Sequence, residues 1–159
     1  MEKYRDRRLS KSQRLNEYNL KSGDEYYQNG IFVFNITRLT EYIKNNKEEF
    51  EIIEVKVKDY QSMDKGKSLN QEYVATADLT RPLILAEIVP DRLKHGYPDI
   101  SLDYYSRGFN VIDGHHRLAK AYQEGIETLS AYVVRMEQHI PFMVKGYDKY
   151  VEYWNSKLV

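Results

Sequence analysis

The sequence contains no cysteine, which excludes disulfide bonds, thiolate nucleophiles and metal sites with cysteine ligands. It has no excess of either charge, because 24 basic residues balance 24 acidic ones. A neutral chain has no overall attraction to nucleic acids or anionic membranes. No apolar run approaches the length of a membrane span, and residues 1–5 lack the apolar core of a secretion signal. We therefore expect a cytoplasmic protein with no membrane partner.

The length and hydrophobic content of the chain are sufficient for one domain. The chain has 159 residues, of which 42% are hydrophobic, and this is enough for a sizeable core. The hydrophobic pattern predicts three stretches: an N-terminal helical extension (1–49), a core (50–135) and a C-terminal helical segment (136–159). The predicted fold class is therefore a single α+β domain, in which helices pack on a small mixed sheet.

The N-terminal extension begins with a basic arm. Its basic residues are Lys3, Arg5, Arg7, Arg8, Lys11 and Arg14. Such an arm can follow a phosphate backbone, but a frayed, solvated terminus is the more common outcome. Farther along, Asn29-Gly30 indicates a turn, and Asn35 or Thr37 is expected to cap a helix that carries Leu39 and Ile43.

The core is predicted to alternate between strands and one central helix. Strands are expected near residues 53–57, 82–89, 109–112 and 128–134, and a helix over 116–124 that ends at Gly125. Two polar loops, 59–80 and 90–108, connect the first three strands, and the second is expected to close a hairpin. The C-terminal segment is expected to pack an aromatic helix on this core. Its apolar residues recur at helical spacing: Tyr147, Tyr150, Val151, Trp154 and Leu158.

The most informative motif is Asp113-Gly114-His115-His116-Arg117, between the third predicted strand and the helix. A strand that turns through a glycine into a helix directs backbone N–H groups at one point, where the helix dipole favours an anion. Two imidazoles and a guanidinium at that point are suitable donors for phosphate. Gly114, His115, His116 and Arg117 are therefore the predicted phosphate-binding residues.

The motif and its flanking strands resemble the ParB N-terminal/sulfiredoxin-like superfamily. The resemblance extends from about residue 50 to 134 and includes the Gly114-x-x-Arg117 helix start. That superfamily includes CTP-binding partition proteins, ATP-using sulfiredoxins, ADP- or ATP-dependent free-serine kinases and nuclease-like proteins. The resemblance implies that a nucleotide (ATP, ADP or CTP), with Mg²⁺, binds at the motif, whose form is most similar to the serine-kinase branch.

The sequence departs from these families at several points, and these differences reduce the number of activities that the resemblance implies. Sulfiredoxin chemistry needs a cysteine where this chain has His115, so that activity is excluded. Partition proteins continue into a large helix-turn-helix domain, and few residues follow the core here, so we do not expect sequence-specific DNA partitioning. The kinase branch places a catalytic glutamate after the first core strand. The corresponding loop has Asp64, Glu72 and Asp78, and no motif selects among them.

The acidic residue of the motif and its arginine each have alternative roles. Asp113 could cap the helix, hold Mg²⁺ or orient a histidine. Adjacent helical residues point about 100° apart, so one histidine is expected to face the ligand while the other is structural. Arg117 is expected either to clamp phosphate or to pair with a buried carboxylate such as Glu87.

Glu87 is an acid among apolar neighbours on a predicted strand. A buried carboxylate requires a partner or a raised pKa, whereas at a sheet edge it would be solvated. Buried near Arg117 or His116, it could orient them or act as a general base. The predicted catalytic residues are thus Glu87, Asp113 and His116, with Asp113 as the metal ligand. His95 and His139 are expected to lie at the surface or in loops.

Three functions remain open at this point. The first is a nucleotide-dependent phosphotransferase or nucleotide hydrolase. The second is a non-catalytic module that senses nucleotides or binds nucleic acid through the same site and the basic arm. The third is a nuclease-like phosphodiesterase in which Asp113 and a histidine manage metal and water. All three share phosphate binding at residues 113–117.

Overall fold

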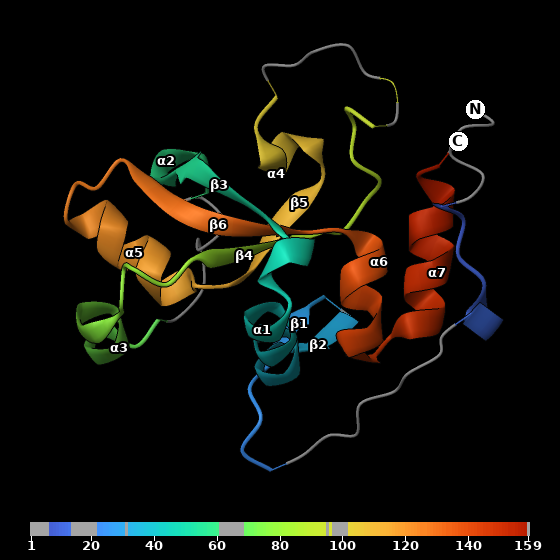
Figure 1. The fold of residues 1–159 in the computed structure, drawn as a ribbon, viewed down its shortest axis with the longest axis horizontal. Coiled ribbons are helices and arrows are strands. Elements are labelled where there is room, and N and C mark those ends of the chain that lie inside the picture. The colour runs from blue at the N-terminus through green and yellow to red at the C-terminus, as the bar shows by residue number, and fades with distance from the viewer. Residues whose placement is uncertain are drawn as a thin grey trace.

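A mixed four-stranded sheet forms the centre of the molecule. The computed structural model describes residues 7–13, 22–30, 32–60, 69–94, 96 and 102–158. The central sheet has the order β3-β6-β4-β5 (Figure 1). Its strands are β3 (Glu51–Lys56), β4 (Leu83–Glu87), β5 (Phe109–Asp113) and β6 (Thr128–Val134). β4 and β6 run parallel, and the other two pairs are antiparallel, so the expected mixed sheet is confirmed.

A second, antiparallel sheet lies beside the first. It has the order β1-β2-β7, formed by β1 (Tyr26–Asn29), β2 (Phe32–Asn35) and β7 (Met143–Lys145). Gly30, with φ +65°, lies in the β1–β2 turn that Asn29-Gly30 predicts. The segments 1–49 and 136–159 were expected to be helical, and these three strands correct that expectation; strands of three or four residues are too short for an alternating pattern to reveal them.

Helices flank both sheets. They are α1 (Ile36–Asn45), α2 (Val57–Tyr60), α3 (Gln71–Thr76), α4 (Tyr104–Arg107), α5 (His115–Gln123), α6 (Met136–His139) and α7 (Tyr147–Ser156), with 3₁₀ turns at Lys11–Gln13, Lys47–Glu49 and Ile140–Phe142. The Asn35 side chain accepts a hydrogen bond from the Arg38 N–H at 3.0 Å, which confirms the predicted cap of α1. Gly125 follows α5 with φ +73°, as expected for a residue that ends a helix. Among the described residues, no helix has the length and apolarity needed to cross a membrane.

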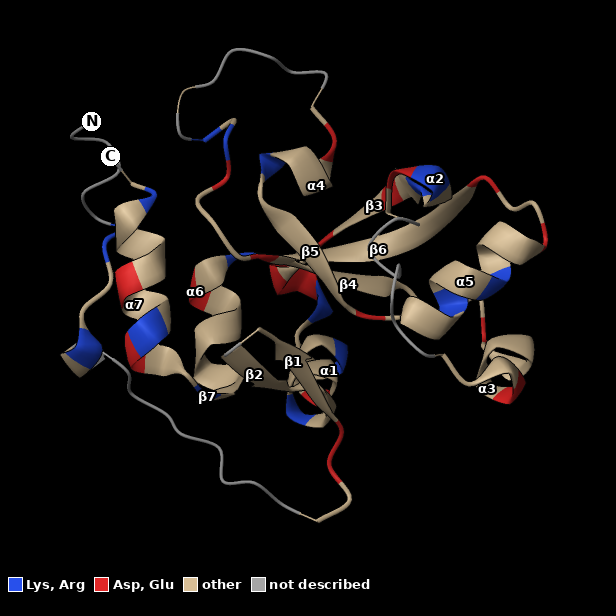
Figure 2. Ribbon diagram, turned by 180° about the vertical axis from the view of Figure 1, so that it is seen from behind, with Lys and Arg blue, Asp and Glu red and all other residues tan. Residues whose placement is uncertain are grey.

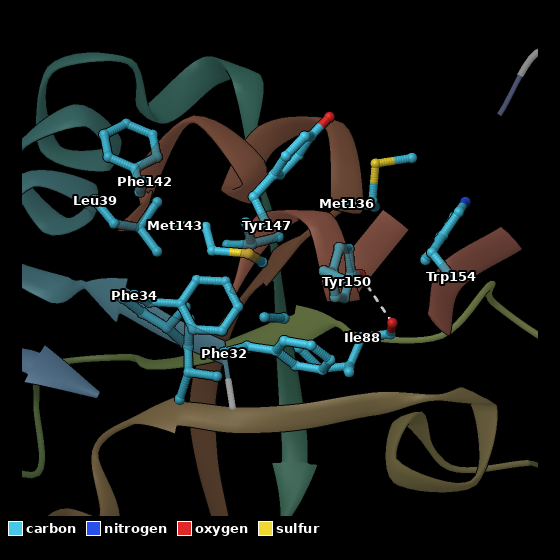
Figure 3. Packing of buried hydrophobic residues seen from close by; sticks show 14 of the residues in the cluster. Phe32, Phe34, Leu39, Ile88, Met136, Phe142, Met143, Tyr147, Tyr150 and Trp154 are labelled. Atoms are coloured by element: carbon cyan, nitrogen blue, oxygen red, sulfur yellow. Dashed lines mark hydrogen bonds between the residues drawn. The ribbon is translucent and has the colours of Figure 1, made fainter. Parts of the chain in front are cut away.

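The central sheet has a hydrophobic core on each face. On one face Leu83 and Leu85 of β4 pack with α2 and α5. On the other face Ile84 and Ala86 pack with α1, α6, α7 and the second sheet. Figure 3 shows part of this second cluster, where phenylalanine, methionine and tyrosine side chains of the flanking elements meet. The alternation along β4 explains why all five of its residues are buried.

The first described residues are packed against α7. The Trp154 Nε1–H donates to the carbonyl of Arg7 at 2.9 Å, and the Leu9 N–H donates to Asn155 Oδ1 at 2.8 Å. Leu9 itself is buried in the same core cluster as Trp154. The expectation of a frayed terminus was therefore wrong for residues 7–9, and both ends of the chain contribute to one core.

Candidate functional site

The candidate site lies where β5 ends and α5 begins. Gly114 is the N-cap of α5 and has φ +107°, a left-handed conformation that favours glycine. A Cβ at this position would lie 2.4 Å from Cδ2 of the buried Leu83, so the Leu83 side chain would have to shift to admit any other residue. The N-cap residue of α5 is Gly114, which has no side chain to cap the helix, so the interpretation of Asp113 as the cap was wrong. The first turn of the helix therefore receives no acceptor from its cap residue.

Asp113 is instead the partner of Arg117. Arg117 Nη2 donates to Asp113 Oδ2 at 2.9 Å, while Nη1 donates to the carbonyls of Arg81, at 2.9 Å, and Pro82. The Arg117 side chain is only 7% exposed. Arg117 thus connects the start of α5 to the segment before β4, and the suggested pairing with Glu87 was wrong. Its role as a direct phosphate clamp stays a prediction.

The two histidines of the motif line a hollow beside β1. This hollow, which we call the histidine hollow, has a volume of about 420 Å³. The His115 ring stacks on Tyr27, with centroids 5.2 Å apart, and the His116 ring meets Tyr73 edge-on at 5.8 Å. The two rings therefore have different aromatic partners, and both residues line the hollow; which of them faces a ligand stays a prediction. The lining residues are Glu25, Tyr26, Tyr27, Leu69, Ile112, Asp113, Gly114, His115 and His116.

Glu87 lies away from the motif. Its carboxylate is fully buried and accepts hydrogen bonds from Arg7 at 2.7 and 2.9 Å, and from the N–H groups of Asp91 and Met136. Ile84 is the residue of β4 that pairs with Asp113, and Glu87 lies three residues farther along, about 10 Å at strand spacing. Both the solvated edge position and the expected proximity to Arg117 or His116 were wrong.

The partner of Glu87 comes from the basic arm. Burial disfavours the charged form of Arg7, but its hydrogen bonds to Glu87 and Glu137 outweigh this and raise its pKa above the ordinary value. Sequence reasoning missed this pair because nothing in the local pattern connects residues that lie 80 positions apart. The ion pair makes Arg7 structural, and it gives Glu87 a structural role in place of the predicted catalytic one.

Asp78 is the loop acid whose pKa is affected by Arg117 of the motif. It is exposed, and hydrogen bonds from Thr80 lower its pKa, helped by the positive charges of Arg81 and Arg117. Glu72 is exposed on α3. Asp64 lies outside the described residues.

The two remaining histidines differ from each other. His139 is fully buried and its Nε2–H donates to the Glu87 carbonyl at 2.6 Å, so the surface position expected for it was wrong. His95 lies outside the described residues.

Neither a metal cluster nor a known relative identifies the site. Within the described ranges, no three histidine, aspartate or glutamate side chains gather closely enough to hold a metal ion. The sequence matches no family model, and no curated protein or solved structure matches it. The function must therefore be inferred from the geometry at β5 and α5.

Proposed function

We propose that this chain binds the phosphates of a nucleotide at the first turn of α5, and that it is a ParB/sulfiredoxin-like protein acting as a phosphotransferase or nucleotide hydrolase. The observation that carries the proposal is the uncapped start of α5, which faces the histidine hollow. Backbone N–H groups at a helix start, the dipole and two imidazoles together form a suitable anion site.

The Asp113–Arg117 ion pair makes the start of α5 compatible with a bound phosphate. An unpaired carboxylate beside the helix start would repel phosphate. Here the guanidinium compensates the charge through Oδ2. Mg²⁺ is usually held by one or two carboxylates together with substrate phosphates, so a three-residue protein cluster is not required. Asp113 is the residue that would hold Mg²⁺, which would neutralise charge on the phosphates.

The order of elements supports the family assignment. β4, α4, β5, α5 and β6 follow one another along the chain, and Gly114-x-x-Arg117 lies at the junction of β5 and α5, which is consistent with the resemblance. Among the acids of the loop before β4, Asp78 takes the place of Glu87 as the candidate acid of the reaction, because it is exposed and close enough to Arg117 for the two charges to interact.

Calorimetric titration with ATP, ADP and CTP, each with and without Mg²⁺, tests the proposal. We expect binding of at least one nucleotide, strengthened by Mg²⁺. Replacement of His116 by alanine should weaken binding by about 1.5–3 kcal/mol, the range for a lost charged hydrogen bond. Gln123→Ala is the control, since Gln123 is exposed at the other end of the same helix.

The outcomes separate the function classes. Absence of binding at millimolar nucleotide would refute the proposal. Binding with turnover supports the enzyme, and binding without turnover supports the sensor. Cleavage of a phosphodiester without any added nucleotide would favour the nuclease-like alternative.

A further inference from the structure

A second hollow, lined by basic residues, adjoins the histidine hollow. Its volume is about 360 Å³, and we call it the lysine hollow. Its positive charges come from Lys44 and Lys47, at the end of α1 and just after it, and from Arg81 before β4. The other lining residues are Thr40, Ile43, Pro82, Ile84, Asp113 and Tyr132. Figure 2 shows the basic segments of α1 close to β1 and the central sheet.

Within the part of the chain that the structure describes, the fold leaves the three cationic side chains without a direct partner, although the charge of Arg81 also acts on Asp78. All three residues are exposed, and none forms an ion pair or side-chain hydrogen bond with another described residue. A cation near the end of a helix can stabilise the terminal carbonyls. At α1, however, Asn46 does this, because its Nδ2–H donates to the Tyr42 carbonyl and its N–H to that of Ile43.

The lining gives the hollow a net positive charge. Asp113 is the acid in the lining, and its charge is compensated by Arg117. Ile43, Ile84 and Tyr132 add apolar walls to the hollow. The volume falls within the usual range for small-molecule sites, roughly 300–1,000 Å³.

We propose that the lysine hollow binds a small molecule through a phosphate or carboxylate group. This inference deepens the proposed function, because it names the chemical class of a second ligand that would bind beside the nucleotide. Only the position beside a nucleotide rests on the proposed function; anion binding in the lysine hollow does not. Asp113 lines both hollows, so an anion bound to Lys44, Lys47 and Arg81 lies across this residue from phosphates at the start of α5.

Amide NMR titration with inorganic phosphate, and separately with succinate, tests the inference. We expect both anions to shift the amide resonances of Lys44, Ile84 and Tyr132. The double variant Lys44→Gln/Arg81→Gln should bind roughly tenfold or more weakly, the loss expected for charged hydrogen bonds. The control is Lys56→Gln/Lys58→Gln, which removes two exposed positive charges that do not line this hollow.

The titration distinguishes the inference from the proposed function. Shifts confined to the amides of Gly114–His116 would contradict anion binding in the lysine hollow and would support phosphate binding at the start of α5. Shifts confined to the lysine hollow would support the inference even where nucleotide binding fails. Equal weakening in both double variants, or no shift in either titration, would overturn the inference. A response to phosphate alone supports it and restricts the ligand to phosphate-bearing molecules.

Discussion

At the scale of single residues, the site depends on one glycine and one ion pair. Gly114 allows the sharp turn from β5 into α5 and the close approach of Leu83. Arg117 then fixes the turn through hydrogen bonds to Asp113 and to the carbonyls of Arg81 and Pro82, just before β4. The two histidines of the first turn are thereby placed at the hollow, where their rings also pack against Tyr27 and Tyr73.

Replacement of Gly114 by alanine should destabilise the fold far more than replacement of Gly125. The Gly114 variant combines left-handed strain with overpacking against Leu83, a cost of about 2–5 kcal/mol. Gly125 has a similar positive φ but open space around it, so its alanine variant should lose only about 1–2 kcal/mol of strain energy. Denaturant unfolding measures both, and equal losses would contradict the crowding argument.

At the scale of elements, the strands and helices with strong patterns were predictable. β3, β4, β6, α5 and α7 follow from alternation, apolar runs and helical spacing, and their predicted positions are confirmed. β1, β2 and β7 were missed, because such short strands depend on pairing with distant segments. The motif at 113–117 was found because glycine and its neighbours are contiguous in sequence, whereas the lysine hollow joins α1 to residue 81 and has no local signature.

The segment 7–13 packs against α7, a contact that the sequence pattern does not predict. Arg7 inserts between Glu87 and Glu137, with its guanidinium 5.0 Å from the Trp154 ring centre. Replacement of Arg7 by alanine leaves Glu87 buried and unpaired, and should lower the free energy of unfolding by about 3–5 kcal/mol. Arg8 is exposed, so Arg8→Ala should stay within about 0.5 kcal/mol in the same denaturation experiment. Similar losses in the two variants would show that Arg7 is not structural.

At the scale of the whole molecule, buried charges join segments from the entire chain. Asp91 accepts hydrogen bonds from Arg107 and Arg135, which connects the loop after β4 to α4 and to the start of α6. His139 donates to the Glu87 carbonyl, and its Nδ1 is buried without a hydrogen-bond partner among the described residues. These groups make the stability of the fold sensitive to pH.

Acid should begin to destabilise the protein at two points, below about pH 6.5 through His139 and below about pH 4 through Asp91. Burial lowers the pKa of His139, so the fold favours its neutral form, and stability falls as the pH drops below about 6.5, where the unfolded chain takes up the proton. Burial disfavours the charged form of Asp91, but Arg107 and Arg135 outweigh this and lower its pKa to about 2. Its contribution, on the order of 2 kcal/mol, is present above about pH 4 and is lost between pH 4 and 2. Unfolding free energies measured from pH 8 to 2 should show both losses. His139→Phe should remove only the first, and an unchanged profile in that variant would contradict the assignment.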